Sequence, residues 1–144
     1  MSLEQASSHE PTKDTYALRI FGRLSRILSR LHPLKESSFY RAIFEYDFDH
    51  IYPNTPDRKE YEILYDRGLA ERLITDFIKN KDGCESLLVS CLYGRNRSPA
   101  IAAALNEIFN LGYDTNSLKE KHPRLNTHVY NTTIETARAL GVLK

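Results

Sequence analysis

Residues 86–112 read SLLVSCLYGRNRSPAIAAALNEIFNLG, and this stretch decides the fold that the sequence predicts. Its start, residues 86–90, is a short and mainly apolar run that follows a turn, as is typical of a buried parallel strand. Its end, from Ser98 to Gly112, places apolar side chains at helical spacing and stops on a glycine. The octet CLYGRNRS, residues 91–98, therefore connects a strand to a helix.

The helix after the octet has clear signals for its start. Ser98 suits the N-cap position, and Pro99 suits the first helical position, where its missing N–H group costs nothing. Ile101, Leu105 and Ile108 then share one apolar face. We therefore expect the N-terminus of this helix to point back toward the octet.

Strands and helices alternate along the rest of the chain. The patterns predict strands over 15–22 and 39–48, a loop over 49–57, and helices over 23–31, over 59–79 and in two segments after Gly112, the last capped by Asn126 or Thr127. This alternation predicts an α/β fold in which helices flank both faces of a central, mostly parallel sheet in a single domain. Ligands of such sheets bind beyond the carboxyl ends of the strands, and Cys91 stands at such an end.

Composition argues against several classes of protein. The 144 residues suit one domain, and the formal net charge of +1 gives no strong field for nucleic acid or an acidic membrane. No apolar run approaches the roughly 20 residues of a membrane span, and the first residues do not resemble a signal peptide. We therefore expect a cytoplasmic protein that binds no nucleic acid and no membrane, with residues 1–13 as a flexible, solvated tail. The oligomeric state stays open.

The two cysteines, Cys84 and Cys91, are too few for a disulfide framework or a zinc site, and the histidines form no metal-ligand pattern. No metal or other cofactor is expected. A disulfide between the two cysteines is a minor alternative to Cys84 as a simple turn residue. A single cysteine in a special context is better interpreted as a candidate nucleophile.

The octet has the residues of a binding site for a tetrahedral anion. Gly94 and Asn96 accept unusual backbone angles, so several loop N–H groups can converge on one point. The helix N-terminus adds about half a positive charge, and Arg97 can offer two N–H groups to the same anion. These groups should lower the pKa of the Cys91 thiol below its free value of about 8.5. A thiolate beside a bound phosphate is a nucleophile aimed at phosphorus.

Cys91, Arg97 and Ser98 match the C-x5-R-[ST] signature, and in this the chain resembles the protein tyrosine phosphatase superfamily. The position of the loop in the second half of a small α/β chain is similar to the dual-specificity branch, and more narrowly to its small prokaryotic members. The low-molecular-weight branch shares C-x5-R-S-P but carries its loop at the N-terminus. A weaker match in the order of elements extends over residues 39–112.

The resemblance implies a cysteine-dependent phosphatase, formed by residues 14–144, that acts on a phosphorylated protein or a small phosphomonoester. Cys91 would be the nucleophile, and Ser98 would help the thiolate to leave. The phosphate would be bound by Leu92, Tyr93, Gly94, Arg95, Asn96 and Arg97. The family usually has a histidine before the cysteine, whereas this chain has Ser90, which implies a slower enzyme or a different tuning of the thiol.

The family also uses an upstream aspartate as general acid, and here Asp47, Asp49, Asp57 and Asp66 compete. Asp49 is favoured because it stands where the second strand should end, at the same edge as Cys91. Asp57 comes second because its spacing is more typical, although it could instead cap the next helix. Asp47 comes third.

Other functions remain open at this level. Ser90 and the unassigned acid leave room for a catalytically weak module that only recognises phosphate. A related cysteine chemistry on the same loop, such as sulfur transfer or arsenate reduction, is a third alternative. Arsenate reduction would need further accessible thiols, and the sequence offers only Cys84. Arg95 is equally compatible with attracting anionic substrates and with being a solvated loop charge.

Overall fold

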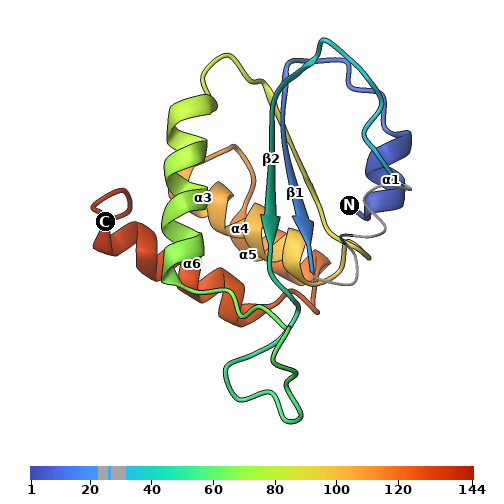
Figure 1. The fold of residues 1–144 in the computed structure, drawn as a ribbon. Coiled ribbons are helices and arrows are strands. Elements are labelled where there is room, and N and C mark those ends of the chain that lie inside the picture. Colours follow the sequence, from blue (N-terminus) through green and yellow to red (C-terminus); the bar gives the residue numbers. More distant parts are fainter. Residues whose placement is uncertain (23–25, 27–31) are drawn as a thin grey trace.

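Three parallel strands form the central sheet of the computed structural model, which describes residues 1–22, 26 and 32–144. They are β1 (Thr15–Phe21), β2 (Tyr40–Asp47) and β3 (Ser86–Ser90), hydrogen-bonded in the order β2-β1-β3 (Figure 1). The predicted α/β fold with a parallel sheet is confirmed, and all three predicted strands form. The helix predicted over 23–31 lies, except for Arg26, outside the described residues.

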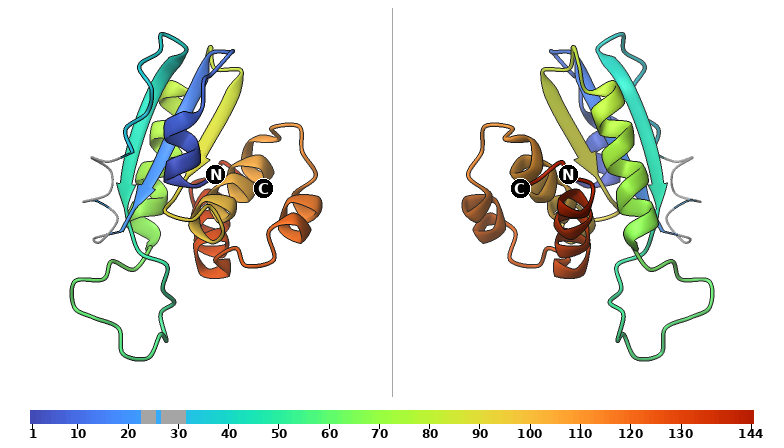
Figure 2. Two further views of the ribbon diagram at one scale, coloured as in Figure 1. Left: turned by 90° about the vertical axis from the view of Figure 1, so that its right-hand side faces the viewer. Right: turned by 90° about the vertical axis from the view of Figure 1, so that its left-hand side faces the viewer.

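Helices cover both faces of this sheet. Figure 2 shows α1 (Leu3–Ser8) and α3 (Arg67–Asn80) on opposite sides of the strands. The core on the α3 side is shared with α4 (Arg97–Phe109), and both α3 and α4 pack on α6 (Thr127–Ala139). A short helix, α5 (Thr115–Lys121), packs against α4.

The central strand β1 packs against the helices on both faces of the sheet. Every one of its seven residues is buried, and successive side chains point to opposite faces of the sheet. Tyr16, Leu18 and Ile20 enter the core that β1 shares with α3 and α4. Ala17 and Phe21 are equally buried and point to the other face, which α1 covers.

Residues 3–8 form helix α1, which corrects the expectation of a solvated tail over 1–13. Ser2 caps the helix in a capping box with Gln5, while Leu3 and Ala6 are fully buried. The Cys91 N–H group donates to the Met1 carbonyl at 3.2 Å, so the segment is attached at the end of β3. Two apolar residues in a polar stretch give too weak a periodicity to predict this packing.

Helix α3 begins at Arg67, so the prediction of a helix from residue 59 was wrong in its start. The Asp66 side chain accepts a hydrogen bond from the Leu69 N–H group at 2.9 Å and caps the helix there. Before the cap, Tyr65 is buried in the core and its hydroxyl lies 2.8 Å from Thr133 Oγ1. This long-range contact fixes the chain just before α3, and residues 48–65 form a long loop between β2 and α3.

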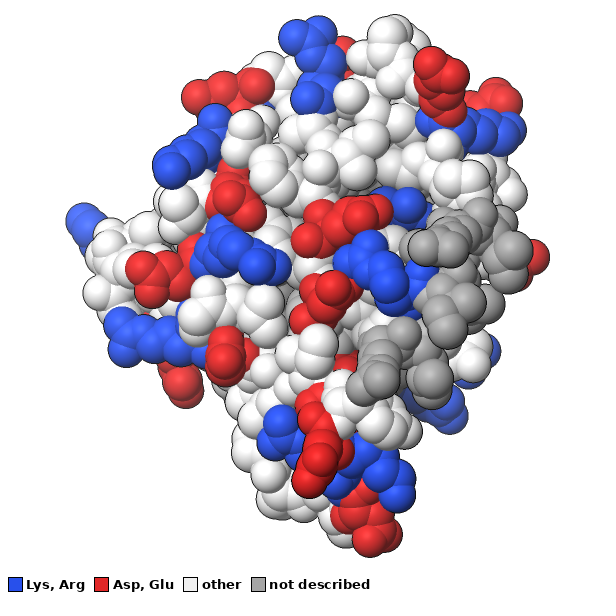
Figure 3. All heavy atoms as spheres, in the orientation of Figure 1, with Lys and Arg blue, Asp and Glu red and all other residues white. Residues whose placement is uncertain are grey.

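Charges of both signs are mixed on the face of the molecule shown in Figure 3. Lysine and arginine alternate with aspartate and glutamate over the face shown in Figure 3, in keeping with the formal net charge of +1. In the described part of the chain, no helix combines the length and the apolar character needed to cross a membrane.

The packing of α1 can be tested by shortening its buried leucine. We expect Leu3→Ala to lower the free energy of unfolding by about 2–3 kcal/mol, because it removes a fully buried side chain. The control is Thr12→Ala at an exposed position, with an expected change within about 0.5 kcal/mol. Urea denaturation measures both variants, and equal stability of the two would show that residues 3–8 do not pack on the sheet.

Candidate active site

The octet 91–98 forms a tight loop between β3 and α4. Gly94 has a φ of 70°, in the left-handed region that glycine adopts without strain. It also lies against the peptide that joins Met1 to Ser2, where an added Cβ would come within 2.6 Å of the Ser2 nitrogen. The angle and the close approach both require glycine here.

The start of α4 differs slightly from the prediction. The helix begins at Arg97 with Asn96 at the N-cap position, so Ser98 lies in the first turn. Asn96 gives no side-chain cap to the helix, and its Nδ2 donates to the Arg124 carbonyl at 2.7 Å. Ser98 is thereby free to face the cysteine instead of capping the helix.

Most backbone N–H groups of the loop find no hydrogen-bond partner among the described residues. Within the described part of the chain, no hydrogen bond is donated by the N–H groups of Leu92, Tyr93, Arg95, Asn96 and Arg97. Unpaired N–H groups in a bent loop that leads into a helix N-terminus form an anion-binding nest. The side chains of Tyr93 and Arg95 are exposed to solvent.

The Cys91 thiol lies at the base of this nest. Its Sγ atom is 3.2 Å from Ser98 Oγ and 3.4 Å from the Ser98 nitrogen, and the residue is only 2% exposed. Burial by itself would raise the pKa of Cys91. Hydrogen bonds from Ser98, the positive charge of Arg97 and the Gly94 N–H group outweigh burial, so the pKa is lowered.

Arg97 connects the loop to the end of β2. Its guanidinium group is buried, and Nη1 donates to the Phe48 carbonyl at 2.8 Å. An added Cβ at Gly22, just after β1, would lie 2.1 Å from Asp49 Oδ1 and 3.2 Å from Arg97 Nη1. The carboxylate and the guanidinium group thus approach the same point, and the glycine leaves the room they need.

Asp49 is held firmly at the base of the loop that follows β2. Its Oδ2 accepts from the Ile63 N–H group at 2.7 Å, and its own N–H group donates to the Ile63 carbonyl at 2.8 Å. The other carboxylate oxygen, Oδ1, faces Gly22. One oxygen therefore positions the side chain, and the second stays near Arg97.

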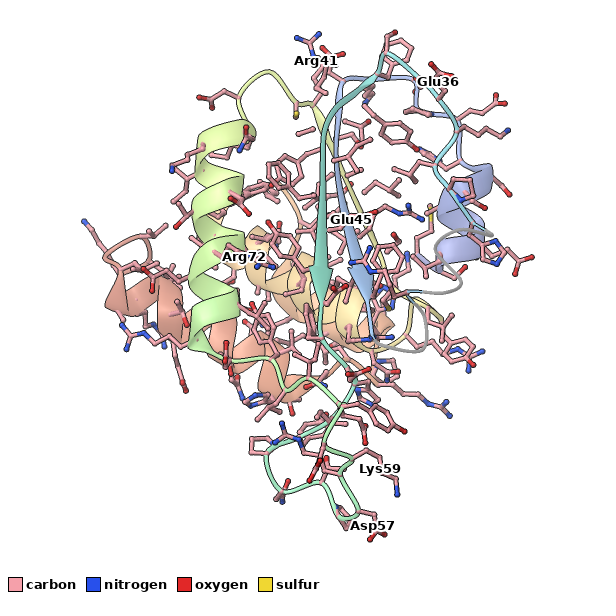
Figure 4. The ribbon with its side chains drawn as sticks, viewed as in Figure 1. Glu36, Arg41, Glu45, Asp57, Lys59 and Arg72 are labelled. Atoms are coloured by element: carbon pink, nitrogen blue, oxygen red, sulfur yellow. The ribbon has the colours of Figure 1, made fainter. Side chains whose placement is uncertain are left out.

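The other three candidate acids lie in different surroundings. Figure 4 shows Asp57 with Lys59 at the far end of the projecting loop. Asp47 forms an ion pair with Arg26, and Asp66 caps α3. Of the four aspartates, Asp49 alone has a carboxylate beside Arg97.

Three residues next to these groups were absent from the predicted site, namely Gly22, His50 and Asn126. Gly22 stands at the end of a predicted strand, and this position is the only feature of the sequence that could have pointed to its place beside the site. Asn126 was predicted only as a helix cap, which it is. Asn126 contacts both the octet loop and the loop after β2, which are far from it in the sequence. No residue spacing in the sequence predicts such contacts.

Cys84 cannot form a disulfide with Cys91. The two residues flank opposite ends of β3, whose five residues span roughly 16 Å. A disulfide needs Cα atoms within about 7 Å of each other. Among residues 1–22, 26 and 32–144, no three His, Cys, Asp or Glu side chains are grouped so that they could hold a metal ion.

No family model, curated protein or solved structure matches the chain. What the site can do chemically must therefore be inferred from its geometry. That geometry is a buried thiol with a lowered pKa, a nest of free N–H groups, a buried guanidinium group and one nearby carboxylate.

The role of Ser98 in tuning the thiol can be measured directly. We expect Ser98→Ala to raise the pKa of Cys91, because the variant loses the side-chain hydrogen bond and keeps burial, which acts in the opposite direction. Thiolate absorbance followed against pH gives the midpoint, with Cys91→Ser as the blank. A midpoint that does not move would show that the hydroxyl group does not stabilise the thiolate.

Proposed function

We propose that this protein is a cysteine-dependent phosphatase that hydrolyses phosphotyrosine or a related phosphomonoester through a phosphocysteine intermediate. The observation that carries the proposal is the position of Cys91 Sγ at the base of a loop in which five backbone N–H groups, those of residues 92, 93 and 95–97, find no partner among the described residues. A phosphate dianion would satisfy those groups together with Arg97. The same proposal places the protein in the cytoplasm, where its thiols stay reduced.

In the first step, the Cys91 thiolate attacks phosphorus and the bond from phosphorus to the ester oxygen breaks. The departing oxygen takes a proton from Asp49, so that an alcohol or phenol leaves. The loop N–H groups and Arg97 stabilise the negative charge on the three equatorial oxygens. The product of this step is phosphocysteine.

In the second step, a water molecule attacks the phosphorus atom of the phosphocysteine. One water proton passes to Asp49, which is thereby restored, and the bond from sulfur to phosphorus breaks. Ser98 donates a hydrogen bond to the departing thiolate, the contact for which its hydroxyl already lies 3.2 Å from Sγ. Inorganic phosphate leaves, and the enzyme returns to its initial state.

Hydrolysis of para-nitrophenyl phosphate tests the nucleophile. We expect wild-type protein to release nitrophenol and Cys91→Ser to lose this activity by a factor of at least about 1,000, because serine is a far weaker nucleophile at neutral pH. Cys84→Ser is the matched control at the other thiol and should keep full activity. Vanadate should inhibit the wild type by occupying the loop.

Two results would contradict this proposal. The first is equal hydrolysis by wild type and Cys91→Ser, which would place the chemistry elsewhere. The second is the absence of hydrolysis together with tight binding of a phosphopeptide, which would establish the alternative of a phosphate-recognition module. That alternative is favoured by one observation: the Ser90 hydroxyl is buried and makes no hydrogen bond with any described residue, so it gives the loop no polar support.

The general acid can be tested with substrates of different leaving groups. We expect Asp49→Asn to lower kcat by roughly 100-fold for phenyl phosphate and much less for para-nitrophenyl phosphate, since nitrophenolate needs little help from a proton. The basic limb of the pH profile should also flatten. Asp57→Asn, at the tip of the same loop, is the control and should leave both rates unchanged. An equal loss on both substrates would remove Asp49 from the role of acid.

A further inference from the structure

Asn126 lies where the two loops of the proposed site come together. It is fully buried at the start of α6, and its N–H group donates to the Asn96 carbonyl at 2.9 Å. Its side-chain Nδ2 lies 3.0 Å from His50 Nδ1 and 3.3 Å from the Ile51 carbonyl oxygen. One residue therefore contacts both the phosphate loop and the segment that directly follows Asp49.

The neighbours of Asn126 determine which way its amide group faces. The Val129 N–H group donates to Oδ1 at 3.0 Å, and an N–H group needs an acceptor. On the other side, the Ile51 carbonyl can only accept, so it requires the NH₂ end of the amide. Nδ2 is therefore the atom that faces His50, and it acts there as a donor.

This orientation settles the protonation pattern of His50. Because Nδ2 donates, His50 Nδ1 must carry a lone pair, and in a neutral imidazole the proton then sits on Nε2. The charged form has protons on both nitrogens and cannot accept this hydrogen bond. The contact with Asn126 exists only while His50 is neutral.

We infer that Asn126 is a positioning residue that sets the spacing between the phosphate loop and Asp49 and holds His50 as its neutral Nε2–H tautomer. The catalytic part of this inference rests on the proposed phosphatase function. Asp49 immediately precedes His50 and Ile51, so holding these two residues also places the carboxylate relative to Arg97. Asn96, on the other loop, is held from both sides, by Asn126 and by the Arg124 carbonyl.

The surroundings of His50 also favour its neutral form. Burial and the positive charge of Arg97, from α4, both lower the pKa of His50, so the ring stays neutral to a lower pH than usual. The other groups that face it are the Tyr52 ring from its own loop, 5.9 Å away, and Asn126 from α6, while Asp49 precedes it in the chain. On acidification below this pKa, His50 becomes charged and the contact with Asn126 breaks.

Nitrogen-15 NMR of the His50 side chain tests the inference in the wild-type protein. The expected spectrum at neutral pH shows an unprotonated Nδ1 and a protonated Nε2. A protonated Nδ1 would overturn the inference, because Asn126 could then not donate to it. This measurement needs no turnover and no folded variant.

Asn126→Asp then separates positioning from simple stability. The carboxylate keeps an acceptor for the Val129 N–H group but removes the donor that faces His50 and Ile51. We expect the His50 proton to move to Nδ1 and kcat for para-nitrophenyl phosphate to fall by about 10- to 100-fold, as is usual when a reacting group is misplaced by about 1 Å. Unchanged His50 signals together with an unchanged kcat would overturn the inference.

Asn106→Asp is the matched control. Asn106 is also a buried amide that accepts from one backbone N–H group, that of Tyr113, and donates to a carbonyl and a side chain, but it lies at the far end of α4. This variant should leave the His50 signals and kcat unchanged. Should Asn126→Asp not fold, Asn126→Ser keeps a capping oxygen and replaces the NH₂ group, with its two donors, by a shorter hydroxyl group with one.

The two proposals fail in different ways. A wild-type protein that hydrolyses no phosphomonoester but shows the Asn126-dependent His50 tautomer would overturn the phosphatase function and support the contacts. Normal hydrolysis in Asn126→Asp, with His50 unchanged, would keep the phosphatase function and overturn the role of Asn126.

Discussion

The backbone N–H groups of residues 92, 93 and 95–97, which donate to no other described residue, are the constraint on which the rest of the structure depends. A loop whose N–H groups form few hydrogen bonds within the protein gains little stability from its own backbone. Other parts of the molecule must therefore hold it in one conformation. The support comes from both flanks. β3 buries the chain up to Cys91, and α4 buries it again from Arg97 onward.

Three further contacts hold the loop from outside. The N-terminal segment receives the Cys91 N–H group and packs against Gly94. Arg97 reaches across to the Phe48 carbonyl, past a glycine that leaves it room. Asn126 holds the Asn96 carbonyl from the start of α6. These contacts come from parts of the chain that are distant in sequence, so the free N–H groups are kept open by tertiary structure.

The charges of the site follow from the same arrangement. Burial of a thiol opposes its ionisation, and the lowered pKa of Cys91 therefore depends on donors and a positive charge placed within a short distance. Ser98 supplies the nearest donors because α4 begins two residues earlier than its sequence signals indicate, so that its hydroxyl lies against sulfur. A shift in the start of one helix thus changes a predicted capping residue into a hydrogen-bond partner of the Cys91 thiol.

The sequence alone determined the octet, the strand before it and the helix after it, because spacing and periodicity are local properties. It also determined the alternation that makes the sheet parallel, and it identified Cys91, Arg97, Ser98 and Asp49 as the residues to consider. Only the tertiary structure decided that residues 3–8 pack as a helix and that α3 begins after its cap at Asp66. It also decided that, of the four candidate aspartates, only Asp49 lies beside Arg97. The role of Asn126 likewise depends on contacts across more than seventy residues of chain. Such contacts arise when the layers pack together, and no local pattern records them.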